Sequence, residues 1–478
     1  MLNMNFIAGE WVAGSSELEN VNPSDTSDVV GTYAQASPEQ VEQAVAAAKA
    51  AQPVWAGMTP QQRADILDQI GTEILSRKEE LGALLSREEG KVLAEGIGEA
   101  TRAGQVFRFF AQEALRVEGT YIDSVRPGVA VDVRREPVGV VGLITPWNFP
   151  IAIPAWKMAP ALAFGNAVLI KPASLTPGSV WALVEIISRT AMPAGVVNLV
   201  MGGGGTVGDT LCGSTDVDAV SFTGSVATGA HVRRMVAGRG GKVQLEMGGK
   251  SPLIIMDDAD PETAVTCAIS GSVMSTGQRC TSNTRIICTP GIHDQVVGQM
   301  AEQAKALRVG HALDAGSQIG PVVDQKQLDT NFRYLEIADK EGASRLCGGE
   351  RLQRPENGFY MSPAVIADCT NDMQHVREEI FGPVVSVLKA DDFDQAVAIA
   401  NDNDFGLSSG ICTGSLKYAE AFKRRSAAGM VMVNLPTAGV DYHVPFGGRK
   451  ASSYGSREQG RAAAEFYTTL KTSYTLAV

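Results

Sequence analysis

The chain has 478 residues, 44 % of them hydrophobic and 20 % charged, which is typical of a globular protein with two or three domains. Its 41 basic and 53 acidic side chains give a net charge of −12, and this acidic balance argues against a nucleic acid or an anionic membrane as the partner. Seven scattered cysteines without a C-x-x-C pair, and five histidines without i,i+4 spacing, predict neither a disulfide framework nor a metal site.

The N-terminal part is predicted to hold strands and then three amphipathic helices. It opens without the basic start and apolar run of a signal peptide, and no apolar stretch reaches the length of a membrane span, so we expect a cytoplasmic protein. Residues 5–12 (NFIAGEWV) favour strands. The pairs Ser37-Pro38 and Thr59-Pro60 are helix-start signals, and a third helical run covers residues 95–117.

Alternation of strands and helices begins near residue 137 and predicts a parallel sheet with crossover helices. The segments 166–173, 195–201 and 218–224 are apolar and rich in β-branched residues, and each precedes a predicted helix. After residue 248 the alternation resumes in what we expect to be a second α/β domain. Residues 463–478 return to strand character, and a lone C-terminal strand of this kind often completes a sheet elsewhere, for example in a neighbouring subunit.

Two glycine-rich segments compete as a phosphate-binding turn. Residues 203–208 (GGGTVG) match G-x-G-x-x-G after a strand, but the acidic residue expected about 20 positions later is absent, which favours a simple glycine-rich turn. In FTGSVATG, Gly224 and Ser225 open a helix directly after a strand, and a helix N-terminus suits phosphate. A tight packing turn is the alternative. Lys171 ends an apolar strand, where it can reach a ribose or phosphate or simply face solvent.

Further side chains suited to chemistry stand in a fixed order along the chain. Asn148 lies in an aromatic loop bounded by prolines, Glu246 precedes two glycines, Cys280 has small polar neighbours (MSTGQRCTSN), and Glu379 and Phe381 stand at the mouth of a strand. Taken singly, these have structural explanations: a turn residue, a solvated strand end, a packed thiol and a helix-terminal charge. Together they form a specific pattern.

With the motifs PWNFP, KPAS, FTGS, LEMGGK, GQRC and EEIFGPV, the chain resembles the aldehyde dehydrogenase superfamily of NAD(P)-dependent enzymes over essentially its whole length. The resemblance implies an α/β fold with a Rossmann-type cofactor domain (1–115 and 138–247) and a second α/β catalytic domain (248–448). It also implies a small β oligomerisation arm with the C-terminal strand (116–137 and 449–478). The expected cofactor is NADP or NAD, the substrate a small-molecule aldehyde, and the assembly a homodimer or homotetramer.

The resemblance makes Cys280 the nucleophile. Its thiolate would add to the aldehyde, hydride would leave the resulting thiohemiacetal, and the thioester that remains would be hydrolysed. Asn148 and the Cys280 backbone N–H would donate to the oxyanion, with Lys157 in support. Glu246 would be the general base for hydrolysis, and the two glycines after it would leave its carboxylate free to swing.

The resemblance also assigns residues to the two ligands. The set around the cofactor is Thr145, Pro146, Trp147, Lys171, Ser174, Gly224, Ser225, Gly229, Met247, Glu379 and Phe381. The set expected at the substrate is Arg279, Arg102, Phe149, Trp156 and Phe446.

Two departures from the family pattern are informative. Many strictly NAD-dependent relatives carry glutamate where this chain has Ser174, and a carboxylate would repel a 2′-phosphate, so we expect NADP⁺ to be accepted as well as NAD⁺ or even preferred to it. Arg279 and Arg102 suit a substrate with a distal carboxylate, although a structural salt bridge or a solvated face explains each arginine equally well.

Segments 150–162, 275–283 and 437–448 resemble the branch of the superfamily that oxidises α-ketoglutaric semialdehyde (2,5-dioxovalerate) to 2-oxoglutarate, and this is the expected reaction. The same chemistry on succinate semialdehyde, glutarate semialdehyde or another aldehyde is the alternative. Two alternatives come from other functional classes: a catalytically silent binding or structural protein on the same fold, and a thiol redox sensor. Turnover of an aldehyde would distinguish an enzyme from both.

Overall fold

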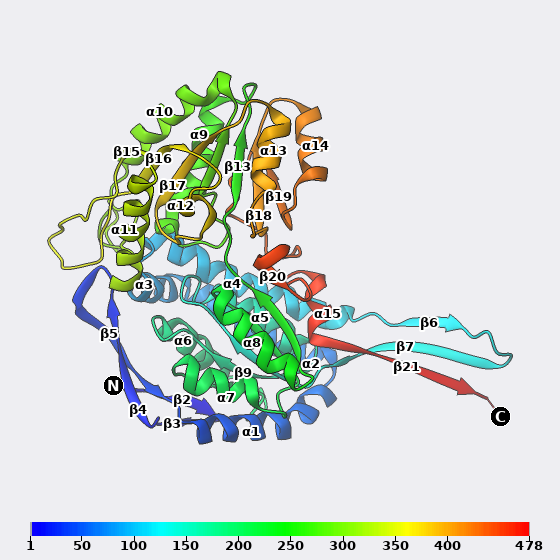
Figure 1. Cartoon of the computed structure of the whole chain (residues 1–478). Coiled ribbons are helices and arrows are strands. Elements are labelled where there is room, and N and C mark those ends of the chain that lie inside the picture. Colours follow the sequence, from blue (N-terminus) through cyan, green and yellow to red (C-terminus); the bar gives the residue numbers. More distant parts are fainter. Residues whose placement is uncertain (1, 478) are drawn as a thin grey trace.

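The computed structural model describes residues 2–477 as two α/β bodies with a projecting β arm (Figure 1). The first body contains segments from both ends of the chain, and the second is built from the sequence between them. The arm leaves the first body and carries the C-terminus. This agrees with the α/β architecture expected from the sequence.

The sheet of the first body is parallel at its centre and antiparallel at its edges. The carboxyl ends of its parallel strands meet at one edge, which is where ligands bind in sheets of this type. Within the described residues the strand order is β20 (Ser453–Tyr454), β12 (Lys242–Glu246), β11 (Ala219–Thr223), β8 (Val140–Ile144), β9 (Ala167–Lys171), β10 (Val197–Leu199), β2 (Asn5–Ile7) and β3 (Glu10–Val12).

The first helices begin where the sequence signals predict. α1 (Pro38–Gly57) and α2 (Pro60–Ser76) each start with a capping box, in which the Ser37 or Thr59 hydroxyl accepts a backbone N–H. α2 ends at Ser76, and only Arg77 separates it from α3. The remaining helices of this body are α3 (Lys78–Glu89), α4 (Leu93–Glu113), α5 (Ala152–Ala163), α6 (Pro177–Ser188), α7 (Asp209–Gly213), α8 (Val226–Gly238) and α15 (Ala464–Tyr467).

The second body follows the first after a short link, because β12 ends at Glu246 and the next strand begins at Pro252. Its sheet is parallel except for β15 at one edge. In the described chain the order is β15 (Ser344–Cys347), β16 (Ala364–Cys369), β17 (Val384–Lys389), β14 (Arg285–Cys288), β13 (Pro252–Ile255), β18 (Ser408–Cys412) and β19 (Met430–Val433). The helices are α9 (Pro261–Ser272), α10 (Pro290–Ala306), α11 (Gln325–Lys340), α12 (Gln374–Arg377), α13 (Phe393–Asn401) and α14 (Leu416–Arg425).

The arm is a sheet of β6 (Thr120–Asp123), β7 (Val129–Pro137) and β21 (Thr468–Leu476), in which β7 is central. β21 pairs antiparallel with β7 of the same chain from Thr468 opposite Pro137 to Leu476 opposite Val129. Large apolar side chains on the arm are exposed, among them Tyr121, Ile122, Leu470, Tyr474 and Leu476. The C-terminal strand therefore has a partner within its own chain, and the arm still presents an apolar surface.

Two features differ from the sequence-based expectations. Ser453–Tyr454 (β20) pairs with β12 in the first sheet, so the segment that begins at residue 449 is not wholly part of the arm. The first residues of the chain do more than form a hairpin, since β1 (Leu2–Asn3) joins β5 (Asp25–Gln35) and β4 (Ser16–Asn22) in a separate sheet. Between residues 2 and 477, no helix is both long and apolar enough to span a membrane.

Candidate active site

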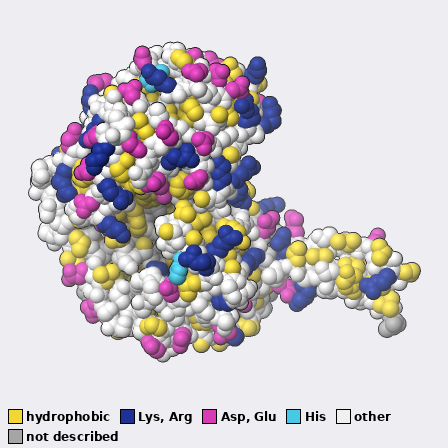
Figure 2. Space-filling model, viewed as in Figure 1, with side chains coloured by type: hydrophobic (Ala, Val, Ile, Leu, Met, Phe, Trp, Pro, Cys, Tyr) yellow, Lys and Arg dark blue, Asp and Glu magenta, His cyan; other side chains and the backbone are white. Residues whose placement is uncertain are grey.

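Cys280 stands at the wall of a cavity formed by both bodies. The molecule is hollowed between them, and hydrophobic side chains gather along the hollow (Figure 2). The cavity has a volume of about 270 Å³, and its walls come from α4, α5 and two loops of the second body. It brings together Cys280 and all the side chains predicted to contact substrate, namely Arg102, Arg279, Phe149, Trp156 and Phe446.

The thiol of Cys280 is protonated in this environment. Burial, together with the nearby carboxylates of Glu379 and Glu246, raises its pKa to about 12. A reactive cysteine usually has neighbours that favour the thiolate, whereas these carboxylates oppose it. Formation of the nucleophile therefore requires transfer of the proton to a base.

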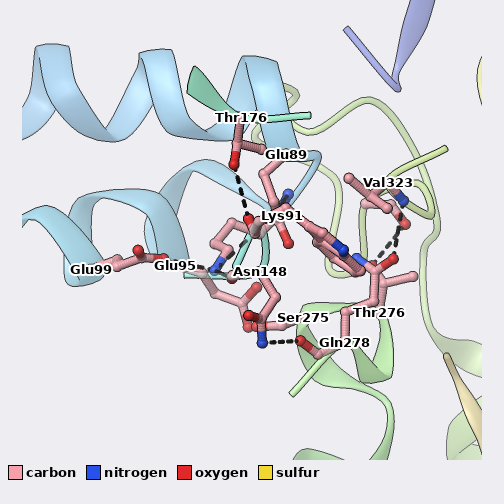
Figure 3. A network of polar contacts seen from close by, with 12 residues as sticks. Glu89, Lys91, Glu95, Glu99, Asn148, Thr176, Ser275, Thr276, Gln278 and Val323 are labelled. Carbon is pink, nitrogen blue, oxygen red and sulfur yellow. Dashed lines mark hydrogen bonds and ion pairs between the residues drawn. The ribbon is translucent and has the colours of Figure 1, made fainter. Parts of the chain in front are cut away.

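Asn148 is held beside the Cys280 loop. Its side-chain Nδ2 donates to the backbone carbonyl of Gln278 at 2.9 Å, two residues before Cys280 (Figure 3). The backbone carbonyl of Asn148 accepts a hydrogen bond from Lys91 Nζ at 2.7 Å. Since an amide nitrogen carries two N–H groups, one remains for a ligand, as an oxyanion donor requires.

Glu246 lies at the end of β12 in a buried position. Burial raises the pKa of its carboxyl well above the usual range, and the charge of Glu458 raises it further. The hydroxyl of Ser453, in β20, donates to Glu246 Oε2 at 2.6 Å. A carboxyl with a raised pKa can both accept and release a proton near neutral pH, which suits a general base.

Lys157 does not line the cavity. It is fully buried in α5, where its ammonium group is paired with Glu458 and donates to Ser221 Oγ at 2.7 Å. The other oxygen of Glu458 accepts from Trp156 Nε1 at 2.6 Å. Glu458 thus joins Lys157 to a side chain that lines the cavity, and the sequence analysis missed it.

The two glycines after Glu246 are required for close packing. A Cβ on Gly248 would lie 2.0 Å from Glu379 Oε2, and a Cβ on Gly249 would lie 2.4 Å from the carbonyl oxygen of Cys280. Glu379 Oε1 in turn accepts the Gly249 N–H at 2.8 Å, and burial raises the pKa of Glu379 to about 7. The glycines therefore bring the Cys280 loop and Glu379 against the link between the two bodies.

A second cavity, of about 710 Å³, opens at the carboxyl ends of β8, β9 and β11. Ser225 caps the N-terminus of α8 there, so free N–H groups of the helix face the cavity entrance. Within residues 2–477, the buried hydroxyls of Thr145 and Thr223 at this cavity have no hydrogen-bond partner. The predicted cofactor residues that line it are Thr145, Pro146, Trp147, Lys171, Gly224 and Ser225.

The glycines at 203–208 belong to this second cavity too. Residues Gly204–Gly208 form a short π-helical turn, in line with the predicted glycine-rich turn. Gly204, Gly205 and Gly208 nevertheless line the cavity. The motif is thus part of the same site as Gly224 and Ser225, although it lacks the acidic residue of the nucleotide fingerprint.

Specific contacts hold some of the predicted cofactor residues in place at this cavity. Lys171 is buried and donates to the carbonyls of Pro172 and Gly202, and burial lowers its pKa to about 8. The rings of Trp147 and Phe381 meet edge to face with centroids 5.3 Å apart. Five of the predicted residues lie outside the lining: Ser174, Gly229, Met247, Glu379 and Phe381.

Gly229 and Met247 act through packing. A Cβ on Gly229 would lie 2.4 Å from Met247 Sδ, so glycine lets α8 pack closely against the end of β12. Ser174 is half-buried in the turn after β9, near the cavity but not on its wall.

The two arginines at the first cavity have different surroundings. Arg279 is already paired, since its guanidinium donates to Glu95 Oε1 at 2.7 Å and to Ser275 Oγ at 2.6 Å. Arg102 lies over the Trp156 ring and donates to Gln459 Oε1 at 3.0 Å. In the described part of the chain, no carboxylate lies within ion-pair distance of Arg102, and its buried Nε has no partner.

Comparison with known proteins identifies the chain. The model of the aldehyde dehydrogenase family matches residues 11–473. The chain belongs to the aldehyde dehydrogenase family. This confirms the resemblance noted from the sequence motifs and the expected enzyme class, an NAD(P)-dependent aldehyde dehydrogenase.

Individual members of the aldehyde dehydrogenase family are similar over almost the full length. The α-ketoglutaric semialdehyde dehydrogenase of Bacillus subtilis is 42 % identical over 98 % of this chain and 97 % of its own. The α-ketoglutarate semialdehyde dehydrogenase of Haloferax volcanii is 41 % identical over 98 % of each chain. A crystal structure of betaine aldehyde dehydrogenase from Staphylococcus aureus in complex with NAD⁺ aligns with a TM-score of 0.97, 33 % identity, and coverage of 99 % of this chain and 95 % of that one.

The residues of this aldehyde dehydrogenase that sequence reasoning missed are mostly distant partners of those it found. Glu458, Ser453 and Gln459 come from a C-terminal segment without a motif of its own, and they contact side chains about 200 to 360 positions earlier. The isolated glutamate in the sequence SREQG was a weak signal for Glu458. No local pattern indicated Lys91 or Thr223.

Proposed function

We propose that this aldehyde dehydrogenase oxidises an aldehyde that carries a distal carboxylate, with α-ketoglutaric semialdehyde as substrate and 2-oxoglutarate as product. The observation that carries the proposal is Arg102, a half-buried cation at the cavity of Cys280 that has no carboxylate within ion-pair distance among residues 2–477, and whose guanidinium Nε is buried without a partner. A buried charge without a partner is costly, and a substrate carboxylate would supply one. The names of the two curated relatives point to the same substrate.

The charge of the cavity wall supports an anionic rather than a cationic aldehyde. Lys91, Arg102 and Arg279 face it together with two carboxylates, Glu95 and Glu99, which leaves an excess of one positive charge. Both carboxylates are already engaged, Glu95 with Arg279 and Glu99 with Lys91. A trimethylammonium group would therefore meet an unpaired cation, although the aligned crystal structure is a betaine aldehyde dehydrogenase.

The reaction begins with activation of Cys280. Its thiol has a raised pKa, and Glu246, which lies near enough to affect that pKa, accepts the proton directly or through water. The thiolate adds to the aldehyde carbon, and Asn148 Nδ2 and the Cys280 backbone N–H stabilise the oxyanion of the thiohemiacetal. Formation of the oxyanion beside pre-oriented donors lowers the barrier to the loss of hydride.

The second cavity fits a dinucleotide cofactor. Lys171, Ser225 and the first N–H groups of α8 would hold the ribose and phosphates, and the unpartnered hydroxyl of Thr145 would donate to the same ligand. When bound, the nicotinamide accepts the hydride that leaves the substrate. Trp147, which lines this cavity, packs edge to face against Phe381. We propose that NADP⁺ is accepted as well as NAD⁺, because Ser174 presents no charge to a 2′-phosphate.

Release of the product depends on Glu246. As general base it removes a proton from the water that attacks the thioester on Cys280. Its hydrogen bond from Ser453 and the neighbouring pair of Lys157 and Glu458 connect it to buried polar groups that can redistribute the proton. The product acid then leaves, and Cys280 returns to the thiol.

A substrate panel with two matched arginine variants tests the proposal. With either cofactor, turnover of α-ketoglutaric semialdehyde should exceed that of betaine aldehyde and of a neutral aldehyde, and Cys280→Ser should abolish it. Arg102→Met, which keeps an apolar side chain over Trp156, should raise KM for the carboxylated aldehyde about 10- to 100-fold and leave KM for the neutral aldehyde nearly unchanged.

Arg279→Met is the matched control for Arg102→Met, because Arg279 lines the same cavity but is paired with Glu95. We expect it to have a smaller and less selective effect than Arg102→Met. Equal increases in KM for carboxylated and neutral aldehydes in the Arg102 variant would contradict its role as the carboxylate partner. Oxidation that survives Cys280→Ser would contradict the whole mechanism.

A further inference from the structure

A buried lysine that the mechanism does not use lies next to the catalytic loops. Lys91, between α3 and α4, is 2 % exposed. Its ammonium group donates to Glu99 Oε2 at 2.7 Å and to the backbone carbonyl of Asn148 at 2.7 Å (Figure 3), and it lies 4.0 Å from the centre of the Phe149 ring. Its contacts therefore go to the segment that carries the proposed oxyanion donor.

The partner of Lys91 holds the same segment further along. Glu99 Oε1 accepts the backbone N–H groups of Ile151 at 3.0 Å and Ala152 at 3.1 Å, at the start of α5. The pair of Lys91 and Glu99 thus contacts the backbone at residues 148, 151 and 152. These contacts fix both ends of the turn that leads from Asn148 into α5.

The side chain of Asn148 is held from the opposite direction. Its Nδ2 donates to the carbonyl of Gln278, and the side-chain Oε1 of Gln278 accepts the N–H of Val323 at 3.0 Å. The first body thus holds the backbone carbonyl of Asn148 through Lys91, and the second body holds its side-chain amide through the carbonyl of Gln278. Loss of the first contact would leave the position of the amide to the second alone.

We infer that Lys91 is a positioning residue, which fixes Asn148 so that the free N–H of its amide meets the oxyanion formed at Cys280. The inference rests on the proposed function. Stability alone does not explain the buried pair, since replacing such a pair by apolar residues is often neutral or stabilising. The hydrogen bond from Lys91 Nζ to the Asn148 carbonyl explains why a lysine is needed at this buried position.

The test is the rate of the first hydride transfer in Lys91→Met. The burst of NADPH or NADH should slow about 10- to 100-fold, because loss of an oxyanion donor costs up to about a thousandfold and displacement costs less. KM for a neutral aldehyde and Kd for the cofactor should each change by less than about threefold, because Lys91 contributes only charge to the wall of the aldehyde cavity and does not line the second cavity.

Two further variants separate positioning from folding. Glu88→Gln alters a buried carboxylate near the end of α3, which accepts N–H groups of Gly178 and Ser179 instead of contacting the Asn148 loop, and it should leave the burst rate unchanged. Lys91→Met combined with Glu99→Gln removes the charges of this pair and leaves only Glu89, the other buried carboxylate beside Lys91, so it should recover thermal stability but not the burst rate. Recovery of both would show that the lysine only stabilises the fold and would overturn the inference.

A double-mutant cycle gives the decisive measurement. If Lys91 acts through Asn148, adding Lys91→Met to Asn148→Ala should slow the burst no further than Asn148→Ala alone. Additive losses would overturn the inference while leaving the proposed function intact. Aldehyde oxidation by a Cys280→Ala variant would overturn the proposed function itself, so the two failures are distinguishable.

Discussion

The pKa values of Cys280 and Glu246 are both raised. The pH dependence of the enzyme should therefore follow the proton that passes from the Cys280 thiol to the Glu246 carboxylate. Burial opposes charge on both groups, and the charge of Glu246 also raises the pKa of Cys280. At low pH Glu246 is protonated and cannot accept the thiol proton or activate water. Activity should therefore rise with pH as the carboxyl ionises, at a pH above the range of an ordinary glutamate.

Glu246→Gln tests this assignment. Both deprotonation of Cys280 and hydrolysis of the thioester depend on Glu246, so we expect a slower burst of reduced cofactor, followed by little turnover, measured by stopped-flow absorbance. Hydroxylamine, which cleaves thioesters without a base, should restore part of the turnover. A variant with unchanged steady-state turnover and an unchanged pH profile would remove Glu246 from the mechanism.

The predicted acceptance of NADP⁺ depends on a single residue, Ser174. Ser174→Glu introduces a carboxylate beside the position proposed for the 2′-phosphate, so kcat/KM for NADP⁺ should fall about 10- to 100-fold while the value for NAD⁺ changes little. Ser174→Ala is the control, since it removes the hydroxyl without adding charge. Wild-type turnover with NADP⁺ that is negligible beside that with NAD⁺ would contradict the expectation.

At the scale of elements, local signals were sufficient for the helix starts and for most strands. Ser37 and Thr59 form the capping boxes that their sequences predict, because a cap involves residues only three positions apart. The division of residues 60–89 into α2 and α3, at Arg77, left no Pro or Gly to mark it. The edge strand β20 is two residues long, and its place depends on a partner strand about 200 positions earlier.

The arm is the element that we propose to mediate self-association. Leu470, Tyr474 and Leu476 alternate along one face of β21 and are more than half exposed, at 64 %, 62 % and 57 %. An exposed apolar face on a projecting sheet is a candidate interface with a second copy of the chain. The double variant Leu470→Asp/Tyr474→Asp should shift the protein to a smaller species in analytical ultracentrifugation.

Thr475→Asp serves as the matched control for the arm, because Thr475 is exposed on the opposite face of the same strand. It should leave the assembly unchanged. The thermal stability of the double variant should then depend less on protein concentration than that of the wild type. An unaltered sedimentation profile in the double variant would contradict the role of this face.

For the whole molecule, the sequence predicted the two α/β bodies and which motifs belong to the site, but not how the site is held together. Cys280, Arg102, Arg279, Phe149, Trp156 and Phe446 meet at one cavity as expected. The supporting contacts could not be foreseen, because Lys91 with Asn148 and Lys157 with Glu458 join segments from different parts of the fold. Local sequence patterns reflect residues that are close along the chain, whereas tertiary packing brings these two pairs together.

The late return of the chain to the first sheet has a consequence for biosynthesis. Ser453, which holds the general base, and Glu458, which pairs with Lys157, are made after the nucleophile and after both main sheets except β20. A ribosome-bound chain that has emerged only as far as residue 450 has its cysteine in place and its base unsecured. A premature stop codon at position 453, which removes both Ser453 and Glu458, should thus yield protein that reacts with aldehydes poorly.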